Sequence, residues 1–308
     1  MSREFNQKVI AAKIETVVGT DAAPDGTNAI LARNVQPRIL EADEITRDFA
    51  QNYLGNTELG YTNLRSSLSF EVELAGSGTA GTAPAYGPLL RACGFQEVIN
   101  VGTDVTYNPV SGGFEACTIH FEQDGDLHKM QACRGSVDFV IPRNAYPFLR
   151  FNFIGLYNDP VTGTIATPDF SGFQDPVEVN FDNTPTAQLH GQDVVLQSLE
   201  LSMGNDVGLR NLPGQKEVRL KDRSPSGQMI FDAPAVATFN YFTRVPARTT
   251  GALSLTHGTV AGNIVELSAP KVQLKPMEYS DDENVLSLTT PLHPLPLVGD
   301  DEIRLVVK

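Results

Sequence analysis

The residues with the most recognisable chemical spacing are Gly76, Gly78 and Gly81, which fit the GxGxxG pattern of dinucleotide-binding loops. They follow a predicted strand and precede a predicted helix. A dinucleotide fold also needs that strand to be buried on both faces and to be continued by a parallel βαβ pattern. Here the strand shows Glu71 and Glu73 to solvent, and antiparallel hairpins follow. An enzyme with a nucleotide site at this loop is therefore the least favoured of three interpretations.

A second group of chemically capable residues crowds around one predicted hairpin turn: His120, Glu122, Asp124, Asp126 and His128. The hairpin would bring the two histidines near each other, and imidazole is a common zinc ligand. Polar residues around an Asp-Gly-Asp turn are also typical of an ordinary solvated turn, which is the interpretation we prefer. No HExxH, GxSxG or GxxxxGK[ST] motif occurs. We therefore expect no enzymatic activity, no cofactor and no metal.

The 308-residue chain is acidic, with 37 Asp and Glu, 23 Lys and Arg, and a formal net charge of −14. Proteins that grip nucleic acid need basic surface, so this balance argues against a nucleic-acid-binding protein and fits a surface that must not retain DNA. No apolar run of 18 residues exists, so we expect no membrane insertion. Three cysteines without CxxC spacing and the lack of an apolar N-terminal segment indicate synthesis in a reducing cytoplasm.

The element that organises the first half is a strand and helix at residues 65–95. Leu68, Phe70, Val72 and Leu74 alternate with Ser67, Ser69, Glu71 and Glu73. A period of two places the first set on a buried face of a sheet and the second on a wet, acidic face without Lys or Arg. A short amphipathic helix follows, with Gly94 as its stop. The pattern predicts a sheet that is covered by a helix on one side only.

Residues 41–64 are too long and too polar for an ordinary connection, yet they carry several large apolar side chains. We interpret them as an arm that packs on another subunit, and the alternative is a self-packed Ω-loop. The residues expected to make that contact are Asp48, Phe49, Tyr53, Leu54, Leu59 and Tyr61.

The second half repeats this order of elements without repeating the sequence. Residues 204–221, which include Arg210 and Leu212, match the first arm, and residues 223–244 match the strand and helix. The Pro-rich segment between the halves reads as a linker. We therefore expect a mainly β chain with two tandem β-sandwich or barrel domains, each with a short flanking α-helix. Their predicted bounds are 1–165 for the first domain, 166–190 for the linker and 191–308 for the second domain.

The order of elements resembles the major tail tube proteins of long, non-contractile-tailed (siphovirus-type) bacteriophages, in a two-domain variant. The resemblance lies in "KIETVVGTDAAPDGTNAILARNV" (13–35), the arm at 41–64, the strand at 68–74 and the helix at 85–93. In that family each domain is a β-sandwich with a helix, six domains form a ring, and the inner sheets close a barrel around the DNA channel. The resemblance implies homotrimeric rings with pseudo-sixfold symmetry, which stack through extended loops.

The same resemblance implies where the protein works and with what. It would be a structural protein of the virion tail, assembled in the host cytoplasm, with itself, the tape measure protein, the tail terminator and distal tail proteins as partners. Double-stranded DNA would pass through the lumen without specific binding, because an acidic wall repels phosphate. The predicted lumen-facing residues are Ser67, Ser69, Glu71, Glu73, Asp138 and Asp232.

The main alternative is a carbohydrate-binding or adhesive β-sandwich, or a virion decoration module. Such a module usually shows a cluster of exposed aromatic residues. The chain has no Trp and its eight Tyr residues are dispersed, which disfavours this alternative.

Overall fold

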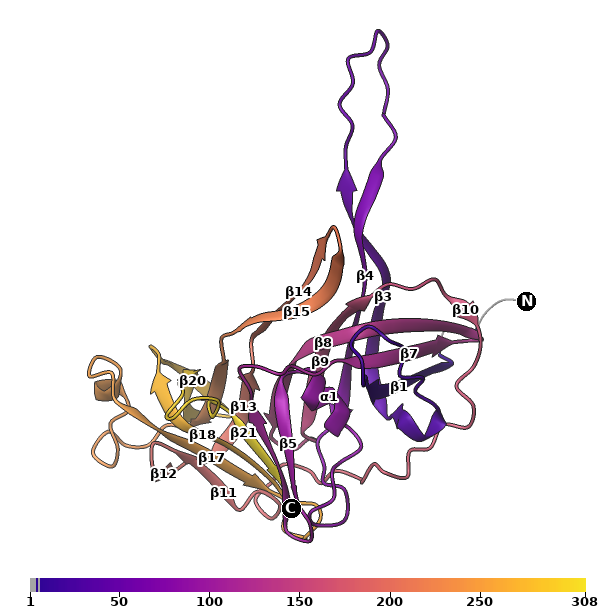
Figure 1. Ribbon diagram of the computed structural model, residues 1–308. Helices are drawn as coiled ribbons and strands as arrows, with labels where there is room; N and C mark the ends of the chain where they lie inside the picture. The colour runs from indigo at the N-terminus through magenta and orange to yellow at the C-terminus, as the bar shows by residue number, and fades with distance from the viewer. Residues whose placement is uncertain (1–3, 5) are drawn as a thin grey trace.

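The computed structural model describes residue 4 and residues 6–308, and it is built almost entirely from antiparallel strands (Figure 1). The first half contains β1 (Lys8–Ile14), β2 (Ala29–Ile30), β3 (Ala32–Ile45), β4 (Gly60–Glu73), α1 (Gly87–Ala92), β5 (Phe95–Asn100), β6 (Asp104–Pro109), β7 (Cys117–Gln123), β8 (Asp126–Pro142), β9 (Phe148–Leu156) and β10 (Val161–Thr162). A 3-10 turn (Gly26–Asn28) precedes β2.

The second half contains only strands and one 3-10 turn. Its strands are β11 (Thr186–Leu189), β12 (Gln192–Asp193), β13 (Leu196–Ser202), β14 (Asn205–Leu212), β15 (Gln215–Arg223), β16 (Ser226–Asp232), β17 (Thr250–His257), β18 (Val265–Leu274), β19 (Glu278–Asp282), β20 (Val285–Pro294) and β21 (Arg304–Val307). The 3-10 turn is Phe242–Arg244.

One continuous sheet runs through both halves of the chain. Its eight strands are hydrogen-bonded in the order β3–β4–β9–β8–β13–β16–β20–β19. The halves meet at the β8–β13 pair, where Phe139 lies opposite Leu201. We call this pair the internal seam. Because every pair is antiparallel, the sheet can bury one face and expose the other.

A second layer covers the buried face of this sheet. In the first half it is β2–β1–β7–β8, and in the second it is β12–β11–β17–β18, extended through β21 to the β6–β5 hairpin of the first half. β8 belongs to both layers, because its first part pairs with β7 and its later part with β9. The C-terminal strand β21 therefore ties the two halves together at a second place.

The core forms where the alternation in β4 predicts it. Leu68, Phe70, Val72 and Leu74 are all at most 2% exposed. The ring centroid of Phe70 lies 5.7 Å from that of Phe151 on β9. The helix α1 packs against β1 and β5 and adds the fully buried Leu89 and Leu90 to the same core. Burying such a side chain stabilises the fold by about 1.5–3 kcal/mol, so this face cannot turn to solvent.

The order of strand pairing recurs between the halves. In the first half it is β1–β7–β8–β9–β4–β3. In the second it is β11–β17–β18–β20–β16–β13, with β18 and β19 together in the place of β8. The β5–β6 hairpin has no counterpart among the strands of the second half.

Two elements differ from the sequence-based expectations. Residues 41–64 are not a long loop, because β3 and β4 extend into them and leave only 46–59 outside the strands. The second half has a 3-10 turn in place of the expected α-helix. Val236, Thr238 and Asn240 are poor helix formers, and Pro234 and Pro246 limit the segment to the residues between them.

Candidate assembly and channel surfaces

The exposed face of the eight-stranded sheet carries four of the predicted channel residues side by side. Ser67, Ser69, Glu71 and Glu73 on β4 are partly exposed and alternate with the core residues. Asp138 on β8 lies two strands away, directly opposite Arg150 of β9. Asp232 ends β16 in the second half, where its carboxylate accepts a hydrogen bond from Gln197 (2.8 Å). The sheet therefore brings these residues onto one surface from both halves.

The expectation that this face lacks basic residues is wrong. Arg33 on β3 forms ion pairs with Glu71 (3.1 Å) and Glu73 (3.4 Å). Arg150 on β9 contacts Glu71 (3.7 Å), Asp138 (3.7 Å) and Glu200 of β13 (3.1 Å). The alternation of one strand cannot show which residues its neighbours place beside it, because the register decides that.

The row of charges remains acidic in spite of these arginines. Four carboxylates and two guanidinium groups meet across β3, β4, β9, β8 and β13, a formal excess of two negative charges. The ion pairs cross four strand boundaries, including the internal seam through Arg150 and Glu200. The surface can therefore repel phosphate while opposite charges hold its strands in register.

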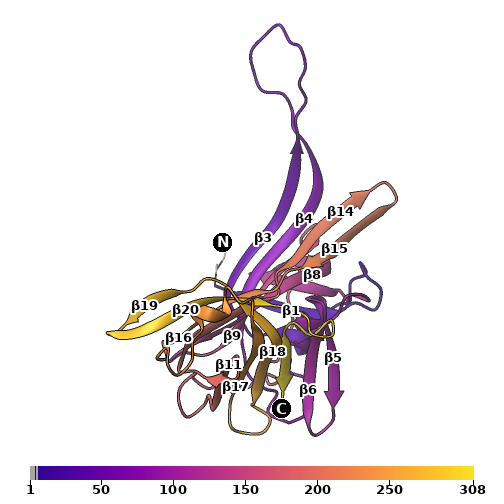
Figure 2. The same ribbon diagram turned by 90° about the vertical axis from the view of Figure 1, so that its left-hand side faces the viewer.

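The β3–β4 hairpin projects far from the body of the molecule (Figures 1 and 2). We call residues 46–59 at its tip the first arm. The base of the first arm is held by Asp43, which accepts hydrogen bonds from Asn63 (2.7 Å) and Arg65 (2.9 Å). These two contacts hold the pKa of Asp43 below its usual value.

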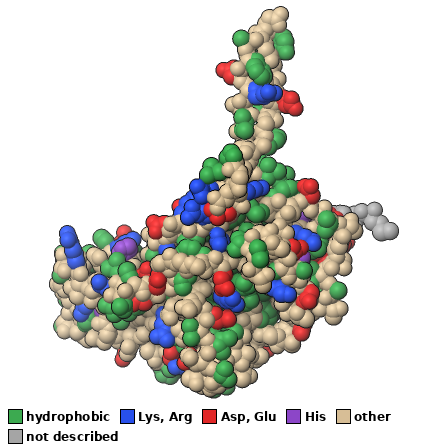
Figure 3. All heavy atoms as spheres, viewed as in Figure 1, with side chains coloured by type: hydrophobic (Ala, Val, Ile, Leu, Met, Phe, Trp, Pro, Cys, Tyr) green, Lys and Arg blue, Asp and Glu red, His purple; other side chains and the backbone are tan. Residues whose placement is uncertain are grey.

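The apolar side chains of the first arm and of the strand that follows it are exposed. Their exposed fractions run from 39% at Leu59 to complete exposure at Leu54, with Phe49, Tyr53 and Tyr61 between. Arg47 stacks over the ring of Phe49, and Asp48 is exposed. Figure 3 shows hydrophobic side chains along this projection. A self-packed Ω-loop is ruled out, since such a loop would bury these side chains against itself.

The β14–β15 hairpin, which we call the second arm, is different. It points to the same side of the molecule as β3–β4 but is shorter and turns at residues 213–214 (Figures 1 and 2). Val218 and Leu220 on its inner side are buried, and Asn205 at its base donates to the carbonyls of Cys93 (2.7 Å) and Gly135 (3.0 Å). The second arm is therefore packed on the first half.

The two predicted contact residues of the second arm lie toward its tip. Arg210 forms an ion pair with Glu217 (3.6 Å) on the neighbouring strand, and Leu212 is 48% exposed. Both remain accessible from outside.

The GxGxxG segment has a structural role that the sequence did not suggest. The Gly76 amide donates to Asn263 Oδ1 (2.7 Å), and the Gly78 amide donates to the Gly262 carbonyl (2.9 Å). A Cβ on Gly76 would lie 1.9 Å from the Gly262 oxygen. These glycines allow a loop of the first half to approach a loop of the second half closely.

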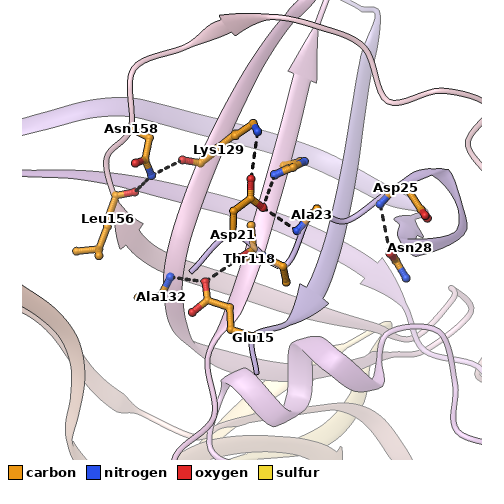
Figure 4. Close-up of polar contacts among 12 residues, drawn as sticks. Glu15, Asp21, Ala23, Asp25, Asn28, Thr118, Lys129, Ala132, Leu156 and Asn158 are labelled. Carbon is orange, nitrogen blue, oxygen red and sulfur yellow. Dashed lines mark hydrogen bonds and ion pairs between the residues drawn. The ribbon is translucent and has the colours of Figure 1, made fainter. Parts of the chain in front are cut away.

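The histidine hairpin is also explained by structural contacts. His120 is buried, and its Nε2 lies 3.0 Å from Asp21 Oδ1. Asp21 also contacts Lys129 (3.1 Å) (Figure 4). The pKa of His120 is lowered, chiefly by burial. Within the described part of the chain, no group of three His, Cys, Asp or Glu residues is arranged to hold a metal ion. The expectation of solvated polar positions is thus wrong for His120.

Nearby, Glu15 has a similar structural role. It accepts hydrogen bonds from the Thr118 hydroxyl (2.8 Å) and the Ala132 amide (2.8 Å) (Figure 4). It thereby fixes the end of β1 to β7 and β8. Cys93, Cys117 and Cys133 are free, buried thiols, and burial raises the pKa of Cys93 and Cys133.

No helix within the described residues is long and apolar enough to span a membrane. Residues 6–292 match the protein-family model described as "Phage tail tube protein". No curated protein matches the chain.

Proposed function

Because this chain belongs to the phage tail tube protein family, we propose that its eight-stranded sheet forms the inner wall of a tube that conducts DNA. The family gives the chain a structural role in the virion, where it assembles with other copies and other tail proteins into the tail tube. The alternative of an adhesive or decorative module is not favoured. What we add is which surfaces of this chain perform each part of that role.

The observation that carries the proposal is the continuous sheet with one wet face and two open margins. An exposed strand edge presents unpaired N–H and C=O groups, and closing a barrel removes such edges. The two halves contribute similar strands to this sheet. We place two tandem domains at about 1–165 and 191–308. β11, within the predicted linker, pairs with β17 and so joins the second of these domains. Three copies would then give a ring with pseudo-sixfold symmetry.

The wet face would line the channel. Ser67, Ser69, Glu71, Glu73, Asp138 and Asp232 would face the DNA, with Arg33 and Arg150 held among the carboxylates. DNA would pass without specific binding, since the excess of negative charge disfavours phosphate contacts.

The first arm would reach a neighbouring ring. Phe49, Tyr53, Leu54, Leu59 and Tyr61 are exposed at the end of a projection, where a second copy can cover them. Asp48, Arg210 and Leu212 would contribute at the edge of the same contact. We infer a siphovirus-type tail, with the tape measure protein inside the tube and the terminator and distal tail proteins at its ends.

The test is the assembly state of the purified chain, measured by light scattering and negative-stain electron microscopy. We expect rings or hollow tubes, at least when assembly is seeded by tail tips. A monodisperse monomer at high concentration that also fails to extend seeded tails would overturn the proposal.

A further inference from the structure

The eight-stranded sheet has one open margin at each end. Within the described residues, β3 pairs only with β4, and β19 pairs only with β20. These margins are the places where a further strand can add to the sheet. The inference below rests on the proposed function and specifies which strands meet, and in which register.

The recurring pairing order allows positions in the two halves to be matched. The Leu74 amide donates to the Pro147 carbonyl (2.8 Å), and the Ala233 amide donates to the Leu286 carbonyl (2.9 Å). These two bonds occupy the same place at the ends of β4 and β16. Ser67 precedes Leu74 by as many residues as Ser226 precedes Ala233, so these two serines correspond. In the same way, Arg150 follows Pro147 at the distance at which Thr289 follows Leu286, so Arg150 corresponds to Thr289.

The same counting extends to the strands at the margins. Arg38 lies opposite Ser67, and Ser202 lies opposite Ser226, so Arg38 of β3 corresponds to Ser202 of β13. On the other side, Asp138 lies opposite Arg150, and Glu278 lies opposite Thr289. Glu278 of β19 therefore corresponds to Asp138 of β8.

The internal seam already pairs β13, the counterpart of β3, with β8, the counterpart of β19. In it, Ser202 pairs with Asp138, Leu201 with Phe139 and Glu200 with Val140. We propose that β19 of one copy pairs antiparallel with β3 of the next copy in the register of this seam. Glu278 then lies opposite Arg38, Tyr279 opposite Pro37, and Ser280 opposite Gln36.

The side chains at both margins fit this arrangement. Arg38 and Glu278 are exposed and oppositely charged, and they would meet on the wet face. Among the residues that the structure describes, Arg38 has one ion-pair partner, Glu41, at 3.5 Å. Opposite charges directly across two antiparallel strands stabilise the pair, and like charges destabilise it.

On the opposite face of β19, the exposure of Tyr279 independently indicates that a further strand adds to this edge. Tyr279 is 54% exposed, although Phe139 at the matching position of the internal seam is fully buried. Phe139 packs against Phe95 (ring centroids 6.2 Å apart) and has β13 beside it across the seam. Tyr279 contacts Phe242 (5.4 Å) on one side, but among the described residues no strand pairs with the outer edge of β19. A second copy that supplies Pro37 and its neighbours would cover this ring.

Pro37 would also limit the pairing of the β3 edge with unrelated strands. In the internal seam the Met203 amide donates to the Val137 carbonyl (3.1 Å), so Leu201, two residues away, lies at a hydrogen-bonding position. Pro37 at the matching position has no N–H to donate. It removes one bond from the seam between copies, and it protects an edge strand against unspecific pairing.

The proposed register can be tested by cross-linking. Arg38 and Glu278 would form a non-hydrogen-bonded pair, with Cα atoms about 4.5 Å apart, a distance that a disulfide can bridge. In tubes of the Arg38→Cys, Glu278→Cys variant, mild oxidation should link copies into covalent oligomers. In the matched control, Gln36→Cys with Glu278→Cys, the diagonal separation of about 7–8 Å should prevent the link.

Charge reversal tests the same pair without oxidation. Arg38→Glu and Glu278→Arg should each raise the protein concentration needed for assembly by about three- to tenfold, and the double variant should return it to near the original value. If tubes form but only the control cysteine pair cross-links, or if the double variant gives no recovery, the register is overturned while the tube function stands. If the unmodified chain forms no tubes under any seeded condition, the proposed function itself fails.

Discussion

The two hairpin arms differ in what covers their apolar side chains. The second arm lies back on the body, with Val218 and Leu220 buried and its base held by Asn205. The first arm stands away from the body, and Leu54 at its tip is completely exposed. Apolar side chains that the chain itself covers stabilise the fold, whereas those left uncovered mark a contact with a partner. We therefore expect the first arm to act mainly in assembly, and the second arm to act mainly in folding, with only Arg210 and Leu212 near its tip at the contact between copies.

The largest expected effect is the loss of ring stacking when the first arm is shortened. Deletion of residues 48–56 should leave the unfolding midpoint of the chain almost unchanged, because these residues make few contacts within it. Tubes should be absent by electron microscopy. A linker of Gly and Ser with the same length is the matched control and should also fail to stack. Normal tubes from either variant would contradict the assignment.

The second arm should show the opposite behaviour. Leu220→Ala should lower the free energy of unfolding by about 2–3 kcal/mol, since it removes a buried side chain and leaves a cavity. Leu54→Ala in the first arm should change it by less than about 0.5 kcal/mol. Urea denaturation of both variants measures the difference. Equal losses would mean that the two arms are not distinguished by their contacts within the chain.

A moderate effect is expected from the charge of the wet face. Glu73→Lys adds positive charge to every ring of the tube, so DNA should be retained along the channel and genome delivery should slow by up to about tenfold. Glu73→Gln keeps the shape and should slow it less. Glu71 is a poorer choice, because a lysine there would lie between Arg33 and Arg150 and weaken the sheet. Unchanged delivery by the lysine variant would remove Glu73 from the channel wall.

The smallest expected effect is a different response of the two halves to acid. Burial lowers the pKa of both His120 and His190. Asp21 opposes the shift at His120, whereas Arg244, which donates to His190 Nδ1 (3.1 Å), adds to it. His190 Nε2 donates to the Val272 carbonyl (3.0 Å), so an additional proton would have to bind at Nδ1, the nitrogen that accepts from Arg244.

The sign of the change in stability with pH follows from the unfolded state, in which histidine has a pKa of about 6.5. Stability from a neutral buried histidine is present above that pH and is lost as the pH falls below it. Hydrogen exchange at pH 7 and pH 5, corrected for intrinsic rates, should show β11 and β17 losing protection before β7. Equal loss in both halves would contradict this comparison.

The sequence predicted the parts of the molecule that depend on local pattern. The alternation of Phe70 and Val72 with Glu71 and Glu73 identified both faces of β4, because a side chain period of two is a property of one strand. The exposed aromatic residues of the first arm stood out because they are unusual in a loop. The recurring order of elements was also visible without the structure.

The sequence could not show what depends on contacts between distant strands. Arg150 reaches Glu71, Asp138 and Glu200 only because β9 lies between β4 and β8 and the seam brings β13 next to β8. The close approach of Gly76 to Gly262 joins loops almost two hundred residues apart. A three-glycine spacing alone does not distinguish that packing from a nucleotide site.

The most direct test of the account is an electron cryomicroscopy reconstruction of assembled tubes. The account predicts three copies per ring, with the face that carries Ser69, Glu71 and Asp138 lining the channel and β19 of each copy beside β3 of the next. A channel lined by the other layer, or copies that meet away from these two strands, would contradict it.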